Sequence, residues 1–178
     1  MKRLLFVLAL STLLVGCAPE AAPELPPVGG STYTVKLTPS KSTLTNEDSG
    51  SAIQVELASE EDETVKYKFE IGSPCYLKNL GSGLQEIIVK PNAYIKSVSN
   101  YTVKRLVVDF YGGKGTNFNV YGNGETSLEY HASSIPAADP NDGGMVYEYE
   151  VNHTSWQIKN ETEFNKPGFY SISVIFEK

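Results

Sequence analysis

The chain has 178 residues and a formal net charge of −6 at pH 7, with acidic and basic side chains mixed along its length. Proteins that bind nucleic acid carry a basic stripe, and proteins that bind anionic lipid by charge carry basic clusters. This acidic, mixed composition therefore excludes both functions and predicts no nucleic-acid partner.

The first predicted element is a secretory signal at residues 1–16. Lys2 and Arg3 precede an apolar run from Leu4 to Val15, which is the order of charge and hydropathy in a signal peptide. The run is shorter than the ~20 apolar residues that cross a bilayer as a helix. It ends in Leu14-Val15-Gly16-Cys17, where a small residue precedes a cysteine.

This segment resembles the signal peptides of bacterial lipoproteins, whose lipobox is a short apolar triplet followed by cysteine. The resemblance implies that Cys17 becomes the first residue of the mature protein and carries a diacylglyceryl thioether. Two or more acyl chains, palmitate among them, anchor a protein stably. The membrane is then a partner through the lipid anchor alone, and the expected location is the cell envelope, facing the exterior or the periplasm. An ordinary signal peptide with a chance cysteine is the alternative.

Residues 17–31 predict a tether that begins at the lipidated Cys17 and ends in Gly29-Gly30-Ser31. Its prolines oppose both helix and sheet, which favours a semi-rigid spacer. Residues 32–178 then have the usual size of one domain. Cys75 is the only thiol in that domain, so no internal disulfide is predicted. We expect Cys75 to be a small buried or half-buried residue and not a nucleophile.

Apolar and polar residues alternate with a period of two through most of this domain. In residues 65–71, Val65, Tyr67, Phe69 and Ile71 alternate with charged residues, which predicts a half-buried strand. Similar runs predict strands at Tyr33–Leu37, Ile53–Leu57, Leu84–Lys90, Tyr94–Val98, Val103–Tyr111, Asn117–Tyr121, Ser127–His131, Met145–Val151, Ser155–Lys159 and Phe169–Glu177.

Many short strands without a helical period predict an all-β fold, in the form of a single antiparallel two-sheet β-sandwich. We favour a jelly-roll-like arrangement, with an immunoglobulin-like one as the alternative. The strand pattern is loosely similar to the jelly-roll modules of secreted and envelope proteins, some of which bind carbohydrate. Trp156 and the alternating residues of the last strand, Tyr170, Ile172, Val174 and Phe176, are predicted to face the core.

Residues 105–123 predict a hairpin with Gly112–Thr116 as its loop. In this register Phe110 opposes Phe118 and Val108 opposes Val120, so that both apolar pairs face the core. The outward face then presents a candidate ligand site made of Arg105, Asp109, Tyr111, Asn117, Asn119 and Tyr121. Tyrosine rings pack on the apolar face of a sugar, and amides, carboxylate and guanidinium bind its hydroxyl groups. The alternative is that these residues only stabilise an exposed sheet.

A calcium site is a further candidate, with Asp139, Asn141 and Glu150 at positions 1, 3 and 12 of a calcium-loop pattern. Position 5 is Gly143, which offers no side-chain oxygen, so an ordinary turn is the alternative. Beyond calcium, no cofactor is predicted. The triplet Asn160-Glu161-Thr162 matches the N-glycosylation acceptor, a match expected by chance in a bacterial lipoprotein.

Catalytic motifs such as G-x-S-x-G and H-E-x-x-H are missing from the chain, and His131 and His153 are its only imidazoles. The prediction is therefore a protein that is not an enzyme. We expect a surface-anchored, non-catalytic binding module for a glycan or another extracellular polymer. The alternative is a structural, assembly or adhesion subunit of the envelope that binds a protein partner through a sheet edge.

Overall fold

A computed structural model describes residues 30–112, 118–124, 126–163 and 166–178. These residues form strands and two short 3-10 helices, η1 (Pro39–Lys41) and η2 (Pro140–Asp142). The strands are β1 (Thr32–Leu37), β2 (Ile53–Ala58), β3 (Lys66–Ile71), β4 (Cys75–Gly81), β5 (Leu84–Val89), β6 (Tyr94–Ser97), β7 (Thr102–Tyr111), β8 (Asn119–Gly122), β9 (Thr126–Ser127), β10 (Tyr130–Ala132), β11 (Gly144–His153), β12 (Trp156–Lys159) and β13 (Gly168–Glu177). None of the described residues belongs to a helix long and apolar enough to cross a membrane.

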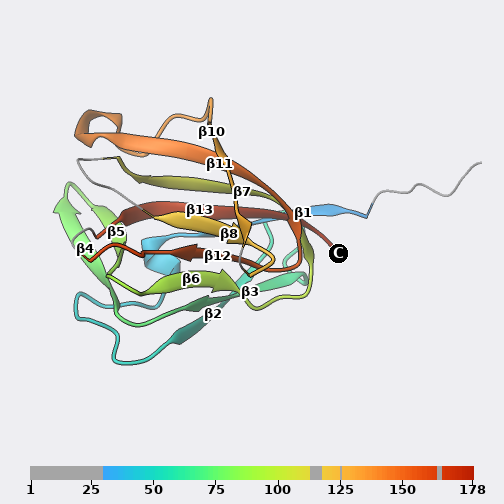
Figure 1. Cartoon of the computed structure of the whole chain (residues 1–178), viewed down its shortest axis with the longest axis horizontal. Helices are drawn as coiled ribbons and strands as arrows, with labels where there is room; N and C mark the ends of the chain where they lie inside the picture. The colour runs from blue at the N-terminus through green and yellow to red at the C-terminus, as the bar shows by residue number, and fades with distance from the viewer. Residues whose placement is uncertain (1–29, 113–117, 125, 164–165) are drawn as a thin grey trace, which may run out of the picture.

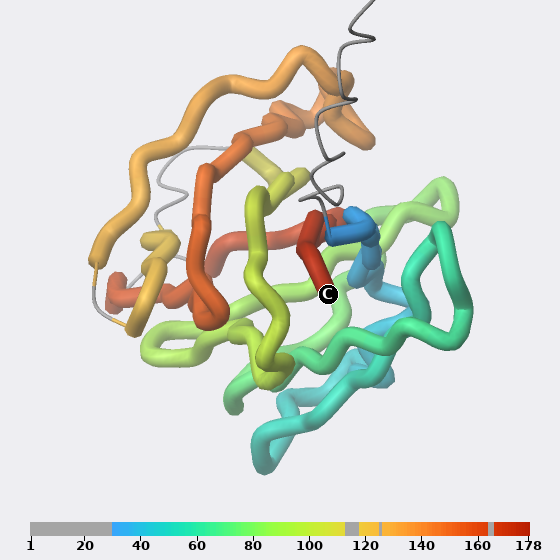
Figure 2. Tube along the Cα trace, turned by 90° about the vertical axis from the view of Figure 1, so that its right-hand side faces the viewer, coloured from blue at the N-terminus to red at the C-terminus, as the bar shows by residue number. Residues whose placement is uncertain are grey.

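Two antiparallel sheets pack face to face, which confirms the predicted all-β sandwich (Figure 1). Sheet A has the strand order β10-β11-β7-β13-β5-β4, and β1 also pairs with β13. Sheet B has the order β2-β3-β6-β12-β8-β9. In both views β1 lies beside the C-terminal end of the chain (Figures 1 and 2), where Thr32 pairs with Glu177.

The strand pairs are nested, as in a jelly roll. β5 pairs with β13, β6 with β12, β7 with β11 and β8 with β9, and these pairs belong alternately to sheets A, B, A and B. A long antiparallel ribbon wound around the core produces this order, which is the jelly-roll topology and not the immunoglobulin-like one. Of the remaining strands, β4 and β10 form the edges of sheet A, β2 and β3 extend sheet B, and β1 pairs with β13.

Aromatic side chains fill the centre of the sandwich. Tyr67, Phe69 and Phe176 are fully buried, and Trp156 is almost so, as predicted. The Trp156 Nε1–H donates a 2.8 Å hydrogen bond to the Tyr67 hydroxyl, which donates in turn to Ser97 Oγ at 2.8 Å. Burial of a polar group is costly unless the group is hydrogen-bonded. These two hydrogen bonds give partners to the indole N–H of Trp156 and the hydroxyl of Tyr67 inside the core.

The predicted hairpin is wrong, because its two strands lie in different sheets. β7 pairs with β11 and β13 in sheet A, whereas β8 pairs with β12 and β9 in sheet B. The core-facing assignment holds, since Val108, Phe110 and Val120 are buried. Phe110 and Phe118 do meet edge to face, with ring centroids 4.8 Å apart, but they meet across the sandwich rather than along one sheet.

Three details of the strand pattern also differ from prediction. β4 was not predicted, and residues 127–131 are divided between β9 of sheet B and β10 of sheet A. A register shift lies between Phe169 and Ser171, so Phe169 joins the central cluster in place of Tyr170. A bulge moves a residue to the other face of a strand. Ile172, Val174 and Phe176 are in the core as predicted.

Cys75 is fully buried, as expected, and burial raises the pKa of its thiol to about 12. Such a thiol does not form the reactive thiolate at neutral pH. Asn160 is also fully buried. Its Nδ2–H donates to the Val89 carbonyl at 2.9 Å, and its Oδ1 accepts a hydrogen bond from Thr162 Oγ1 at 2.8 Å. The acceptor triplet at Asn160 is therefore a structural element of the core.

Candidate functional site

The predicted ligand residues are divided between two opposite outer faces. Arg105, Asp109 and Tyr111 lie on β7 in sheet A, while Asn119 and Tyr121 lie on β8 in sheet B. Asn117 and the lipidation site Cys17 lie outside the described residues. The single face that the hairpin register predicted is thus not formed, because that register is wrong.

On sheet B, Asn119 and Tyr121 both bind Glu161, which follows β12. The Asn119 amide donates to Glu161 Oε2 at 2.7 Å and the Tyr121 hydroxyl donates to the same oxygen at 2.5 Å. Together with Lys159, which donates to Oε1 at 3.0 Å, they lower the pKa of Glu161 to about 2. These side chains satisfy one another, which favours the interpretation that they stabilise the sheet.

On sheet A, Arg105 lines a shallow hollow at the end of the sandwich where β1 begins. The other lining residues are Thr32, Lys104, Glu150, Asn152 and Ile175. The cations in it are paired, since Arg105 Nη1 lies 3.3 Å from Glu148 and Lys104 Nζ lies 3.1 Å from Glu177. With its cations paired and no aromatic ring in its lining, this hollow offers no face on which a sugar would stack.

Asp109 is half-buried on the outer face of sheet A. The backbone N–H of Ala138 donates to both oxygens of its carboxylate, at 3.1 and 3.3 Å. Burial raises the pKa of Asp109 to about 6, although the Ala138 N–H and the charge of Lys36 oppose the shift. Asp109 therefore holds the segment that follows β10 against the sheet, and it is not presented to a ligand.

Nearby, Glu86 is buried with one oxygen unsatisfied. Its side chain is 3% exposed, and its closest cation is Lys78, with Nζ 3.8 Å from Oε2. Glu86 Oε1 and the Tyr170 hydroxyl are buried, and neither has a hydrogen-bond partner among the residues that the structure describes. Burial raises the pKa of Glu86, opposed chiefly by the charge of Lys78. A carboxyl in these surroundings favours its protonated form.

We expect the substitution Asp109→Asn to change stability with pH in a defined direction. The folded-state pKa of about 6 lies above the ordinary value of 3.8. The stability contribution of Asp109 is thus fully present below pH ~4 and is lost as the pH rises through about 6. Urea unfolding should therefore show D109N gaining stability relative to wild type between pH 4 and pH 8.

Asp62→Asn is the matched control with the opposite sign. Hydrogen bonds from Thr64 lower the pKa of Asp62, so its contribution is present at neutral pH and is lost as the pH falls. The prediction for D109N is wrong if its free energy of unfolding differs from that of wild type by the same amount at pH 4 and at pH 8.

The predicted calcium ligands are not brought together. The Asp139 carboxylate caps η2 by accepting hydrogen bonds from the backbone N–H groups of Asn141 and Asp142, and Gly143 ends the turn with a φ of 84°. Glu150 lies farther along β11, about 20 Å from Gly144 at ~3.3 Å per residue. No group of three or more Asp, Glu, His or Cys side chains suited to a metal occurs in the part of the chain that the structure describes. The alternative interpretation as a turn accounts for this loop.

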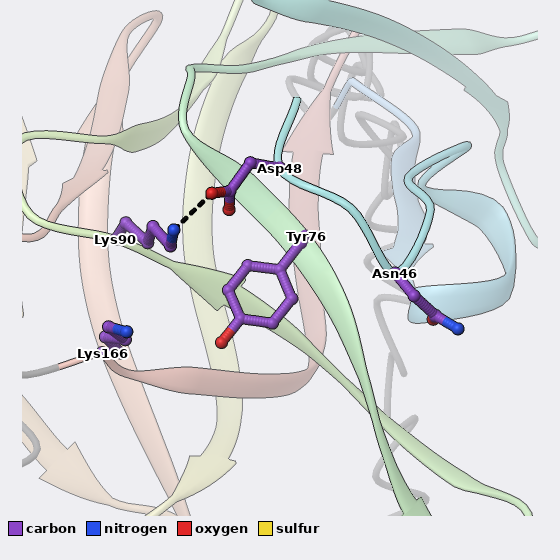
Figure 3. A pocket seen from close by; sticks show the side chains of 5 residues that line it. All are labelled: Asn46, Asp48, Tyr76, Lys90 and Lys166. Carbon is purple, nitrogen blue, oxygen red and sulfur yellow. Dashed lines mark hydrogen bonds and ion pairs between the residues drawn. The ribbon is translucent and has the colours of Figure 1, made fainter. Parts of the chain in front are cut away.

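A different hollow, around Tyr76, combines an aromatic ring with polar groups (Figure 3). It encloses about 220 Å³ and is lined by Asn46, Asp48, Tyr76, Lys90 and Lys166. Figure 3 shows the Tyr76 ring between Lys90 and Asn46, with Lys166 on the side of its hydroxyl group. We define these five residues as the Tyr76 hollow.

Backbone hydrogen bonds position each side of the Tyr76 hollow. The segment that carries Asn46 and Asp48 runs along the outer edge of β4, where Leu77 N–H donates to the Thr45 carbonyl at 2.7 Å and Ser49 N–H donates to the Cys75 carbonyl at 2.8 Å. Lys166 is held near the end of β5, because Val89 N–H donates to the Pro167 carbonyl at 3.1 Å. The hollow is therefore built by two loops that are hydrogen-bonded to β4 and β5, together with Tyr76 of β4 and Lys90, which directly follows β5.

The charges in the Tyr76 hollow are arranged around the ring. Lys90 donates a hydrogen bond to the Asp48 carboxylate, and its Nζ lies 5.5 Å from the centroid of the Tyr76 ring. Ammonium groups within ~6 Å of a ring face are attracted to it. Lys166 is exposed and forms no ion pair with any described residue. The hollow thus offers a half-buried ring, a fixed ammonium–carboxylate pair, an amide and a further cation.

Comparison of the chain with protein-family models, curated proteins and solved structures gave no match. The chemistry of the residues themselves therefore has to support any function. Sequence reasoning missed the Tyr76 hollow, since its residues are spread from position 46 to position 166. The available signals were the turn residues around Asn46 and a tyrosine directly after Pro74-Cys75.

Proposed function

We propose that the chain is a lipid-anchored protein of the cell envelope whose jelly-roll domain is a non-catalytic binding module for a glycan or another extracellular polymer. The observation that carries this proposal is the Tyr76 hollow. It combines the face of an aromatic ring with directed hydrogen-bonding groups. Such a ring can pack on the apolar face of a sugar while the polar groups bind its hydroxyl groups. Its volume of about 220 Å³ is below the ~300–1,000 Å³ of enclosing pockets, which suits one unit of a polymer.

The position of the hollow fits display at a surface. Lys166 lies just before the start of β13, while β1 begins at the other end of that strand, where Thr32 pairs with Glu177 (Figure 1). Ten residues of β13 span about 30 Å at ~3.3 Å per residue. An acylated Cys17 would place the anchor at the tether end and the hollow at the distal end.

The substitution Tyr76→Ala should abolish binding in a glycan array while leaving the melting temperature within a few degrees of wild type. The ring is half-buried on an edge strand, so its removal takes away a stacking surface without emptying the core. Tyr121→Ala is the matched control, because Tyr121 lies on the other sheet, where its hydroxyl donates to Glu161, and Y121A should leave glycan binding unchanged. If Y76A retains binding, or if no glycan binds the wild type, the proposed module is wrong.

The proposed anchor has its own test. Intact-mass measurement of the protein extracted from its native membrane should show a chain that begins at Cys17 with the added mass of a diacylglyceryl group and further acyl chains. An unmodified thiol at Cys17, or a retained signal peptide, would refute the lipid anchor. It would leave the proposed binding at the Tyr76 hollow unaffected.

A second candidate function is contact with an envelope protein. The large exposed hydrophobic residues among the described ones all belong to β7, β10, β11 or the segment after β10; they are Tyr111, Tyr130, Ile135 and Met145. β10 is the edge of sheet A, and all three of its residues are exposed. An exposed edge can pair with a strand of another chain. Ala132→Pro, which removes a backbone donor from β10, should then abolish cross-linking to the partner and retain glycan binding.

A further inference from the structure

We infer that the Tyr76 hollow binds an anionic sugar unit, with Lys166 contacting its acidic group. This inference rests on the proposed function and names the class of glycan. The shared chemistry is a sugar ring that carries a negative group, either the carboxylate of a uronic acid or a sulfate ester.

The charge balance of the hollow points to an anion. Two lysines and one aspartate line it, which leaves one net positive charge on a chain whose formal charge is −6. Charge complementarity of this kind guides ligands of opposite sign to a site. A neutral sugar carries no charge with which the excess cation could pair.

The two lysines have different roles. Lys90 is neutralised by Asp48 and lies by the ring, so it can donate to a hydroxyl group but has little charge left for an anion. Lys166 forms no ion pair with the described residues, although Lys78, Lys96, Lys104 and Lys159 each form one. A lysine ammonium is a mobile point charge with three donors. Lys166 can therefore follow the acidic group of a sugar whose ring lies against Tyr76.

The experiment compares chemically matched probes on the detergent-solubilised full chain by calorimetry. The first pair is an oligogalacturonate and its methyl ester, and the second is a sulfated galactan oligosaccharide and its desulfated form. We expect the anionic member of at least one pair to bind at least ~10-fold more tightly than its neutral counterpart. Tighter binding in the first pair alone assigns a uronic acid, and in the second alone a sulfated sugar.

Lys166→Gln should remove that difference, while Lys66→Gln should not. Lys66 is an exposed lysine of β3 in sheet B without an ion pair among the described residues, which makes K66Q the matched control. Raising the salt concentration should weaken binding of the anionic probe to wild type more than to K166Q, because salt screens exposed charges.

The outcomes separate this inference from the proposed function. Equal binding of anionic and neutral probes, or an unchanged preference in K166Q, would overturn the anionic ligand. If Y76A still abolished binding of a neutral glycan, the binding module would stand. If neither anionic probe binds the wild type, but neutral glycans in an array do, only the inference of an anionic ligand is overturned.

Discussion

Replacing Phe176 with alanine should lower the free energy of unfolding by about 3–5 kcal/mol, the range for a buried phenylalanine. Its ring is fully buried and lies against three tyrosines, with centroid distances of 4.9 Å to Tyr67, 5.0 Å to Tyr101 and 5.8 Å to Tyr33. These rings come from both sheets and from the loop before β7, so they cannot close over the cavity together. Urea unfolding monitored by tryptophan fluorescence measures the loss.

Ile135→Ala is the control for this prediction. Ile135 is an apolar residue that is 52% exposed, and its truncation should change stability by no more than about 0.5 kcal/mol. A loss in F176A as small as that in I135A would show that the sheets repack around the missing ring, contrary to the close packing described above.

Replacing Asn160 with alanine should lower the free energy of unfolding by about 2–4 kcal/mol. The side chain connects the end of β5 to the loop after β12, because it donates to the Val89 carbonyl and accepts from both the N–H and the hydroxyl of Thr162. Each buried polar group left unsatisfied costs ~1–3 kcal/mol. Thermal or urea unfolding measures the effect.

Asn119→Ala is the matched asparagine control. The Asn119 amide also donates a hydrogen bond, to Glu161 at 2.7 Å, but on an exposed outer face. Water can replace that bond, so N119A should cost less than about 1 kcal/mol. If N160A and N119A lose the same free energy of unfolding, burial of Asn160 does not make its hydrogen bonds contribute more to stability than exposed ones.

N160A also bears on the candidate site. Asn160 precedes the loop that carries Lys166, and its backbone carbonyl accepts from Asn92 N–H at 2.8 Å, just beyond Lys90. The buried Asn160 therefore fixes the chain on both sides of Lys90, although it does not line the Tyr76 hollow itself.

The local residue pattern was sufficient to identify most strands and the face that each buries. Tyr67, Phe69 and Ile71 are fully buried, whereas Lys66 and Lys68, which alternate with them, are exposed. A strand points successive side chains to opposite sides, so this information is contained within a few neighbouring residues. β4 escaped detection because it is an edge strand in which alternation is weak, with adjacent half-buried residues at Tyr76 and Leu77.

The same pattern could not decide which strands pair. Phe110 and Phe118 bury their rings equally well as neighbours in a hairpin or as partners across the two sheets. The predicted register satisfied every local test and was still wrong, and the predicted ligand face was wrong with it. Only the winding of the nested strand pairs selects the sheet to which β8 belongs.

The sequence by itself determined an all-β domain and most of its inward-facing residues, because both follow from a period of two. The tertiary structure decided which polar groups converge. Asp48, Tyr76 and Lys166 meet because two loops are hydrogen-bonded to the β4–β5 edge. Contacts between residues so distant in sequence depend on the path of the whole chain, which no local spacing encodes.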